Sequence, residues 1–202
     1  MKLAGALLAA GGSTRLGRAK AFLEWRGETF LARLARELAA VASPTIVVVP
    51  PKAGAYAREL EGTGARIVIN RVPARGMGSS IATAARALLQ FAPESDALLL
   101  ALVDQPLADR ELFARLRDAT AAGIGYSACD YGDGALGPPA VFPRAAFASL
   151  RAMTGDRGAR ALLESAGDRL ALVEFPGGRL DVDTAADYER LAAFGAPSSP
   201  RR

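Results

Sequence analysis

Short apolar runs alternate with longer stretches of helical periodicity through the first 121 residues of the chain. The apolar runs are continuous rather than alternating, as strands are when helices cover both faces of a parallel sheet. These predicted strands occupy residues 3–8, 46–49, 66–69 and 97–102. Helical spacing of apolar positions predicts helices at residues 29–41, 54–61, 79–91 and 109–121. Right-handed crossovers through such helices build a doubly wound, mostly parallel α/β sheet of Rossmann-like form, with helices on both faces.

The pattern becomes irregular after residue 122, where glycines and the adjacent pair Pro138 and Pro139 divide the chain into short pieces. The elements expected here are strands at 140–142 and 170–175 and helices at 144–151, at 157–165 and from Thr184. A chain of 202 residues suits a single domain, which we place at residues 1–194. The tail at 195–202 is rich in proline, serine and arginine, and we expect it to be disordered.

Composition removes several classes of protein from consideration. The chain has no histidine and one cysteine, Cys129, which excludes Ser-His-Asp and Cys-His hydrolases, the common zinc sites and an internal disulfide. A single thiol agrees with a reducing cytoplasm, where we expect the protein. The formal net charge of +4 comes with scattered arginines and no basic run interleaved with aromatics, so a mild attraction for phosphorylated small molecules explains it equally well, and we expect no nucleic acid partner.

No membrane partner is expected either, because no apolar run approaches the roughly 20 residues of a membrane-spanning helix. The first run, at 3–8, leads directly into a glycine-rich loop without a cleavage region. We therefore interpret it as a strand rather than a secretory signal.

The glycine-rich loop follows the first predicted strand, at the sheet edge where open α/β folds bind ligands. It contains the adjacent Gly11 and Gly12 and the cations Arg15 and Lys20, so backbone amides and positive charge can meet phosphate oxygens. An ordinary strand-to-helix turn with a basic edge is the alternative. Adjacent glycines do not fit G-x-G-x-x-G, and the P-loop lysine and hydroxyl are missing after Gly17. A nicotinamide cofactor and P-loop ATPase chemistry are therefore not expected.

Acidic residues stand at two places where a metal ligand is expected. Asp104 follows the fourth predicted strand, where a carboxylate projects into the crevice and suits magnesium bound to phosphates. A turn ahead of Pro106 is its alternative role. Asp181 and Asp183 are two residues apart in a short extended stretch, so their side chains face the same way. Asp183 or Thr184 equally suits the N-cap of the last helix.

Five segments, taken in order, resemble the MobA-like nucleotidyltransferase family, and within it most closely the molybdenum cofactor cytidylyltransferases. The family opening L-A-A-G-x-S-x-R-x-G-x-x-K is matched from Leu8 to Lys20, and N…G-M-x-S-S-I is matched by Asn70 and residues 76–81. The later segments D-Q-P, G-D-x-G-A-R and D-[IV]-D-T-x-x-D-Y are matched at residues 104–106, 155–160 and 181–188. The resemblance covers nearly the whole chain and implies a Rossmann-like nucleotidyltransferase fold.

The resemblance implies an enzyme that transfers CMP from CTP to a phosphorylated acceptor, molybdopterin or molybdenum cofactor above all, and releases pyrophosphate. It implies catalytic roles for Arg15, Lys20 and Asp104, and Mg²⁺ binding by Asp104 and Asp183. The implied nucleotide-binding residues are Ala9, Ala10, Gly11, Gly12, Ser13, Arg15, Lys20, Asn70, Ser80 and Asp104. The implied acceptor-binding residues are Asp156, Arg160 and Asp181. Residues 1–122 then form the nucleotide-binding half and residues 123–194 the acceptor-binding half.

The loop that begins Leu8-Ala9-Ala10-Gly11 resembles the cytidylyl branch, whereas the guanylyl branch typically has L-A-G-G. An alanine in the third place adds a methyl group where a larger purine needs backbone room, so we expect CTP rather than GTP or another nucleoside triphosphate. The resemblance also implies transient contact with a molybdoenzyme or a cofactor-insertion chaperone.

One departure from the family concerns the acceptor. The family usually has G-H-P or G-N-P, whereas this chain has Gly137 followed by Pro138, which offers neither a side-chain donor nor a backbone N–H. Acceptors such as methylerythritol phosphate or a sugar phosphate therefore stay open, and so does a non-catalytic nucleotide-binding chaperone. For Asp156 and Arg160, a surface helix with a Gly-Asp cap is the alternative.

Overall fold

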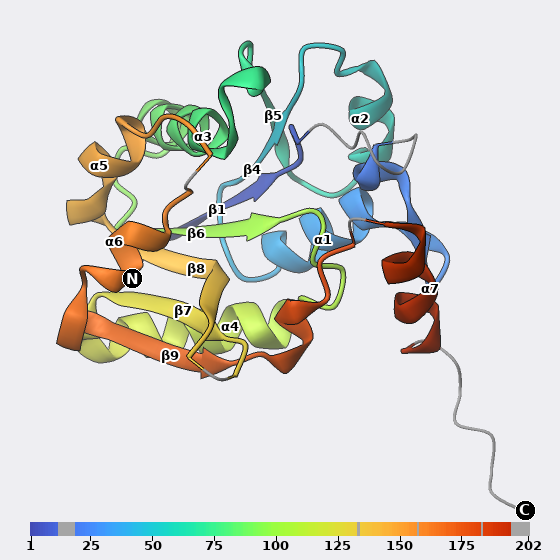
Figure 1. Ribbon diagram of the computed structural model, residues 1–202. Helices are drawn as coiled ribbons and strands as arrows, with labels where there is room; N and C mark the ends of the chain where they lie inside the picture. The colour runs from blue at the N-terminus through green and yellow to red at the C-terminus, as the bar shows by residue number, and fades with distance from the viewer. Residues whose placement is uncertain (12–18, 133, 157, 183, 195–202) are drawn as a thin grey trace, which may run out of the picture.

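The computed structural model describes residues 1–11, 19–132, 134–156, 158–182 and 184–194. The main strands are β1 (Leu3–Leu8), β4 (Thr45–Val49), β5 (Arg66–Ile69), β6 (Ala97–Leu102), β7 (Tyr126–Asp130), β8 (Leu136–Pro143) and β9 (Leu170–Glu174). They form one seven-stranded sheet in the order β5-β4-β1-β6-β8-β7-β9 (Figure 1). β8 runs antiparallel to β6 and β7, and the other neighbours pair in parallel. The predicted α/β fold with a mostly parallel sheet is confirmed.

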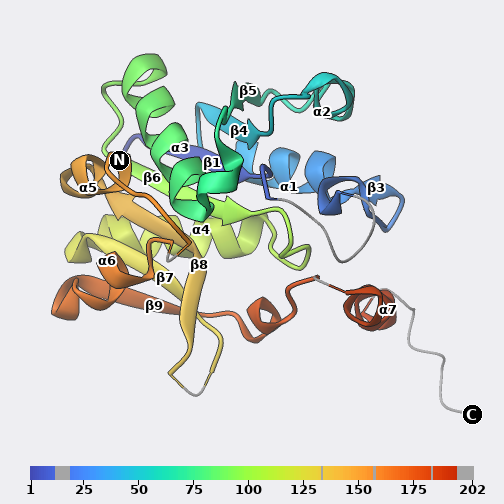
Figure 2. The same ribbon diagram turned by 45° about the horizontal axis from the view of Figure 1, so that its top comes forward.

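Helices lie against both faces of the sheet (Figures 1 and 2). The helices are α1 (Phe30–Ala39), α2 (Gly54–Glu59), α3 (Met77–Phe91), α4 (Arg110–Ala119), α5 (Phe147–Arg151), α6 (Arg160–Glu164) and α7 (Ala185–Ala193). Shorter 3-10 turns occupy Lys20–Phe22, Pro73–Arg75, Arg144–Ala146, Gly167–Arg169 and Pro176–Arg179, and a π turn occupies Thr120–Ile124.

Two apolar clusters, one on each face, explain why central strands such as β1 and β6 contain no polar side chain. In β1, Leu7 packs into the cluster that includes residues of α1 and α4, whereas its neighbour Ala6 packs into the cluster of α3 and α5. Both side chains are fully buried. Successive side chains of a strand point to opposite faces, so a strand covered on both sides contains no polar alternation.

Side-chain caps determine where two of the predicted helices begin. The Oγ1 of Thr29 accepts a hydrogen bond from the Ala32 N–H at 3.2 Å, and the Oδ1 of Asp109 accepts one from the Leu112 N–H at 2.9 Å. Each cap satisfies a backbone donor that the first helical turn leaves unpaired, and stabilises its helix by about 1 kcal/mol.

Several short elements differ from the prediction. β7 and a hairpin of β2 (Glu24–Trp25) and β3 (Glu28–Thr29) are not among the predicted strands. β2 and β3 have two residues each, too few for any periodicity. β7 carries a buried polar side chain, and the hydroxyl of this Ser127 donates to the Leu116 carbonyl at 2.8 Å.

β8 is longer than the predicted strand at 140–142. Pro138 and Pro139 lie outside residues 140–143, the part of β8 that pairs with β6, so their missing N–H groups remove no bond from that ladder. The predicted helix at 157–165 begins only at Arg160, after Gly158 takes a left-handed φ of 58°.

No helix of the described ranges has the length and apolar character that spanning a membrane requires. The predicted tail at 195–202 lies outside the described residues.

Candidate active site

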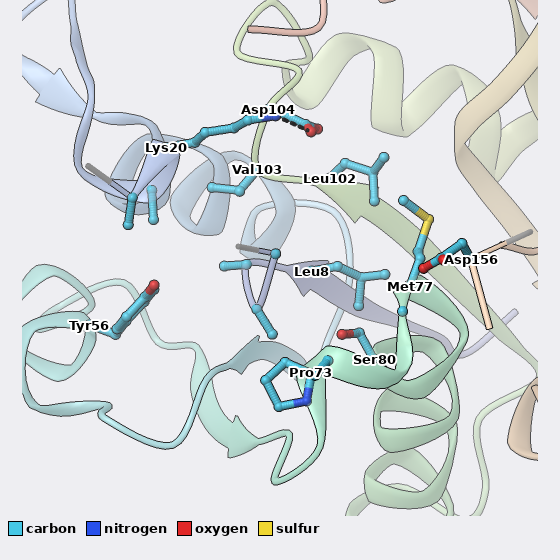
Figure 3. Close-up of a pocket in the computed structure, with 17 residues that line it drawn as sticks. Leu8, Lys20, Tyr56, Pro73, Met77, Ser80, Leu102, Val103, Asp104 and Asp156 are labelled. Carbon is cyan, nitrogen blue, oxygen red and sulfur yellow. Dashed lines mark hydrogen bonds and ion pairs between the residues drawn. The ribbon is translucent and has the colours of Figure 1, made fainter. Parts of the chain in front are cut away.

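A pocket of about 760 Å³ lies at the carboxyl ends of the central strands (Figure 3). Its walls include the ends of β1 and β6, which are neighbours in the sheet. β4 and β5 lie on the other side of β1, so the chain adds strands on one side of β1 first and on the other side afterwards. The chain order therefore reverses between β1 and β6, and such a switch point is where open α/β sheets bind ligands. Seven of the predicted site residues line it: Ala9, Ala10, Gly11, Lys20, Ser80, Asp104 and Asp156.

Lys20 and Asp104 form an ion pair on the pocket wall. The Nζ of Lys20 lies 3.1 Å from the Oδ2 of Asp104, and the two side chains are 14% and 25% exposed (Figure 3). The other carboxylate oxygen, Oδ1, is buried and has no hydrogen-bond partner within the described part of the chain. A buried carboxylate oxygen in this state is energetically costly unless a ligand, a cation or water meets it.

Ala9, Ala10 and Gly11, the described start of the glycine-rich loop, line the pocket. The Ala9 N–H donates to the Val48 carbonyl at 2.8 Å, which extends the sheet pairing beyond the end of β1. Ala10 packs with the α3 face of the core and is 4% exposed, while Gly11 is exposed. Gly12, Ser13 and Arg15 lie outside the described residues.

The segment before α7 passes beside Asp104. The Val182 N–H donates to the Asp104 carbonyl at 3.0 Å. Thr184 and Asp187 cap α7 reciprocally, because the Thr184 N–H donates to the Asp187 carboxylate at 2.8 Å and the Asp187 N–H donates to the Thr184 hydroxyl at 3.2 Å. Asp183 lies outside the described residues, but the cap that it was equally suited to make is made by Thr184.

Asn70 does not line the pocket but lies directly behind Ser80, which does. Its side chain is fully buried and donates from Nδ2 to the hydroxyl oxygens of Ser79 at 2.8 Å and Ser80 at 3.0 Å. These contacts attach the end of β5 to the first turn of α3, and so set the position of Ser80 on the pocket wall.

The G-D-x-G-A-R segment divides into a part at the pocket and a part away from it. The Gly78 N–H donates to the Gly155 carbonyl at 2.8 Å, and a Cβ at Gly76 would lie 2.1 Å from the Oδ1 of Asp156. Glycine is therefore required at the start of α3 for Asp156 to reach the pocket. Arg160 does not line the pocket, and its Nε pairs with Glu164 at 2.8 Å.

Comparison with known proteins identifies the family. A family model described as the MobA-like NTP transferase domain matches residues 5–170. The chain belongs to this family. It is therefore a nucleotidyltransferase of the MobA-like type, with a nucleoside triphosphate as the substrate that the family implies. None of the curated proteins compared with it gives a significant match.

Several solved structures superimpose along nearly the whole chain. Rv0371c of Mycobacterium tuberculosis is 31% identical, with a TM-score of 0.76 over 95% of this chain and 97% of the other. A complex of Rv0371c with manganese is 30% identical, with a TM-score of 0.72 over 96% and 99% of the two chains. A nucleotidyl transferase from Methanothermobacter is 22% identical, with a TM-score of 0.78 over 96% and 97%. This last likeness shows the fold alone.

The Asp104 carboxylate of this MobA-like chain fits a divalent cation. Its unpartnered Oδ1 supplies a hard oxygen ligand at the pocket wall. Among the described residues no three acidic or thiol side chains cluster as a metal site. A magnesium ion held by one or two carboxylates and completed by substrate phosphates and water needs no such cluster.

Two residues beside the site of this MobA-like chain, Gln105 and Tyr131, were not among those predicted. The Nε2 of Gln105 donates to the Tyr131 hydroxyl at 2.8 Å, and that hydroxyl donates to the Pro138 carbonyl. Burial above all, together with the charges of Asp181 and Asp104, raises the pKa of the Tyr131 phenol. Tyr131 therefore stays protonated and holds Pro138 where the family usually has a polar side chain. Gln105 could have been found from the D-Q-P motif, but Tyr131 belongs to no motif.

Proposed function

We propose that this MobA-like chain is a Mg²⁺-dependent cytidylyltransferase that transfers CMP from CTP to a phosphorylated acceptor, with molybdopterin or molybdenum cofactor as the first candidate. The observation that carries the proposal is the pairing of Lys20 with Asp104 in a 760 Å³ pocket, where the second oxygen of Asp104 is buried and unpartnered among the described residues. A cation to hold phosphate and a carboxylate to hold a metal thus lie 3.1 Å apart at the switch point of the sheet.

The predicted roles divide between the two halves of the chain. Residues 1–122 hold the nucleotide, with Arg15 and Lys20 on the triphosphate and the backbone of Ala9 to Ser13 around base and phosphates. Ser80 lies against the nucleoside. Residues 123–194 receive the acceptor, through Asp156, which lines the pocket, and Asp181, which does not line it. Arg160 is the remaining acceptor candidate, although it now pairs with Glu164.

The reaction needs positioning and charge neutralisation rather than a general base. An oxygen of the acceptor phosphate attacks the α-phosphorus of CTP, the bond from that phosphorus to the bridging oxygen of the β-phosphate breaks, and pyrophosphate leaves. The nucleophile is already an anion, so the absence of histidine is no obstacle. A divalent cation, when bound by Asp104 and Asp183, neutralises charge on the triphosphate and the leaving group. Lys20 adds a second positive charge that requires no proton transfer.

The preference for CTP is supported by the surroundings of Ala10. Its methyl group is packed into the core at 4% exposure, so the backbone of the loop has little freedom to recede from a larger base. Turnover with GTP equal to or faster than that with CTP would contradict this assignment without affecting the family.

Transfer to another phosphorylated acceptor is the second candidate, and a specific contact favours it. The Pro138 carbonyl is engaged by Tyr131, and Pro138 has no donor to offer an acceptor substrate. This chain therefore lacks the contact that G-H-P or G-N-P provides in the family. An acceptor that does not depend on that contact, such as methylerythritol phosphate or a sugar phosphate, stays compatible with Pro138.

A pyrophosphate-release screen separates these proposals. The four ribonucleoside triphosphates are each tested with Mg²⁺ against molybdopterin-type, isoprenoid-precursor and sugar-phosphate acceptors. Release with CTP and a molybdopterin acceptor supports the first candidate, and release with CTP and another acceptor supports the second. Binding of CTP without release from any pair would favour a non-catalytic nucleotide-binding chaperone.

A further inference from the structure

The side-chain amide of Asn70 joins three hydrogen bonds, to Val72, Ser79 and Ser80, and we call this group the Asn70 junction. The backbone determines its polarity, that is, which groups donate and which accept. The Oδ1 of Asn70 accepts the Val72 N–H at 3.0 Å, while its Nδ2 donates to Ser79 and Ser80 at 2.8 and 3.0 Å. A backbone N–H is always a donor, so it determines which end of the amide is the oxygen. The NH2 group must then face the two serines, and both hydroxyl oxygens act as acceptors toward Asn70.

The two serines use their own protons differently. The Ser79 hydroxyl lies 2.8 Å from the Gly76 carbonyl and 3.2 Å from the Val72 carbonyl, so its proton is bound within the protein. The Ser80 hydroxyl has no acceptor among the described residues. Ser80 lines the pocket and its hydroxyl points into it (Figure 3), whereas Ser79 does not line it. Of the two serine hydroxyls, the one whose proton has no acceptor among the described residues is therefore the one that faces the pocket.

We propose that Asn70 is a positioning residue that fixes the Ser80 hydroxyl as a hydrogen-bond donor to an acceptor atom of the bound nucleoside, such as a base carbonyl oxygen or ring nitrogen. The proposal rests on the proposed function, because it needs a nucleoside in this pocket. The amide oxygen of Asn70 is hydrogen-bonded to Val72 and its NH2 group to Ser79 and Ser80. Asn70 therefore acts on the nucleotide through Ser80 and not by direct contact. A nucleoside group that can only donate is disfavoured at this point of the wall.

A matched pair of serine variants tests the contact itself. Ser80→Ala and Ser79→Ala each remove one hydroxyl that Asn70 holds, but only Ser80 lines the pocket. Isothermal titration with CTP and Mg²⁺ is expected to show about 3- to 10-fold weaker binding for Ser80→Ala, the loss of one hydrogen bond. Ser79→Ala is expected to bind CTP within about twofold of wild type, whatever its melting temperature.

Reversing the polarity of the junction tests the role of Asn70. In Asn70→Asp one carboxylate oxygen still accepts the Val72 N–H, but the other can only accept, so the Ser80 proton turns away from the pocket and its lone pairs face the nucleoside. The expected result is about tenfold weaker CTP binding. In a Ser80→Ala background the same change is expected to have no further effect, since Asn70 acts through Ser80.

The outcomes separate this inference from the function on which it rests. Wild-type protein that binds none of the four nucleoside triphosphates would contradict both. If wild type binds CTP and Ser80→Ala binds it with the same affinity, the inference alone is contradicted. An Asn70→Asp effect of the same size in both backgrounds would contradict it too, since it indicates a structural role. If Asn70→Asp does not fold, as circular dichroism will show, Asn70→Ser is carried through the same cycle.

Discussion

Replacing Lys20 by alanine is predicted to separate nucleotide binding from folding. Lys20 begins a short 3-10 turn and its Nζ lies on the pocket wall, 3.1 Å from Asp104, so its charge serves the site rather than the core. A charge-assisted hydrogen bond to phosphate contributes about 1.5–3 kcal/mol, so CTP binding should weaken roughly 10- to 150-fold. The ion pair is partly exposed and stabilises the fold by about 1 kcal/mol or less. The melting temperature should therefore fall by no more than about 4 °C.

Titration calorimetry and thermal unfolding on the same sample measure both effects. Lys52→Ala is the matched control, because it removes the same charge from an exposed residue that does not line the pocket. Since Lys20 and a cation compete for Asp104, Mn²⁺ binding without nucleotide is expected to tighten in Lys20→Ala. A Lys20→Ala protein that unfolds far below wild type, yet binds CTP normally once refolded, would refute the assignment of the glycine-rich loop.

Two further predictions concern stability and the acceptor side. Arg110 and Arg36 bind the Glu37 carboxylate at 2.7 and 2.9 Å, and the hydrogen bond from Arg110 above all lowers its pKa from 4.5 to about 2. Because the pKa of Glu37 is lowered in the folded state, its ionised carboxylate stabilises the fold above pH 4.5, and this contribution is lost as the pH falls toward 2. Denaturant titrations should therefore show Glu37→Gln less stable than wild type by about 2 kcal/mol at pH 7 and nearly equal to it near pH 2. Tyr131→Phe removes the hydroxyl that accepts from Gln105 and donates to the Pro138 carbonyl, and should lower stability by about 1–3 kcal/mol. Its CTP affinity should stay within about twofold of wild type, because Tyr131 does not line the pocket, while the KM of the phosphorylated acceptor rises; a change confined to CTP binding would contradict this placement.

The sequence was sufficient for the parallel half of the fold because its central strands, β1, β4 and β6, are buried on both faces. Such strands read as unbroken apolar runs, and the caps Thr29 and Asp109 mark helix starts by their chemistry. β7 could not be predicted in this way, because its buried Ser127 is satisfied by partners on the neighbouring helix and π turn that only the tertiary structure brings together. The β2–β3 hairpin is too short to carry a pattern.

The same distinction applies to the candidate site. Lys20 and Asp104 were predictable because each occupies a motif at the end of a strand, where the topology determines the placement. Tyr131 was not, since it reaches Pro138 through the pairing of β7 with β8 rather than through any motif. Asn70 was identified as a site residue, but its bonds to both serines, which place it behind the pocket, depend on the packing of β5 against α3.

Pyrophosphate release by wild type and Asp104→Asn tests the central claim most directly. The substitution preserves the size of the side chain but removes one negative charge from the buried oxygen that we assign to the metal. With CTP, Mg²⁺ and the acceptor found in the screen, wild type is predicted to release one pyrophosphate for each CMP transferred. Asp104→Asn should be roughly a hundredfold slower or more, at least a few kcal/mol in the transition state, with an unchanged circular dichroism spectrum. Near wild-type release by a well-folded Asp104→Asn protein would show that Asp104 is not an essential metal ligand and would contradict the mechanism.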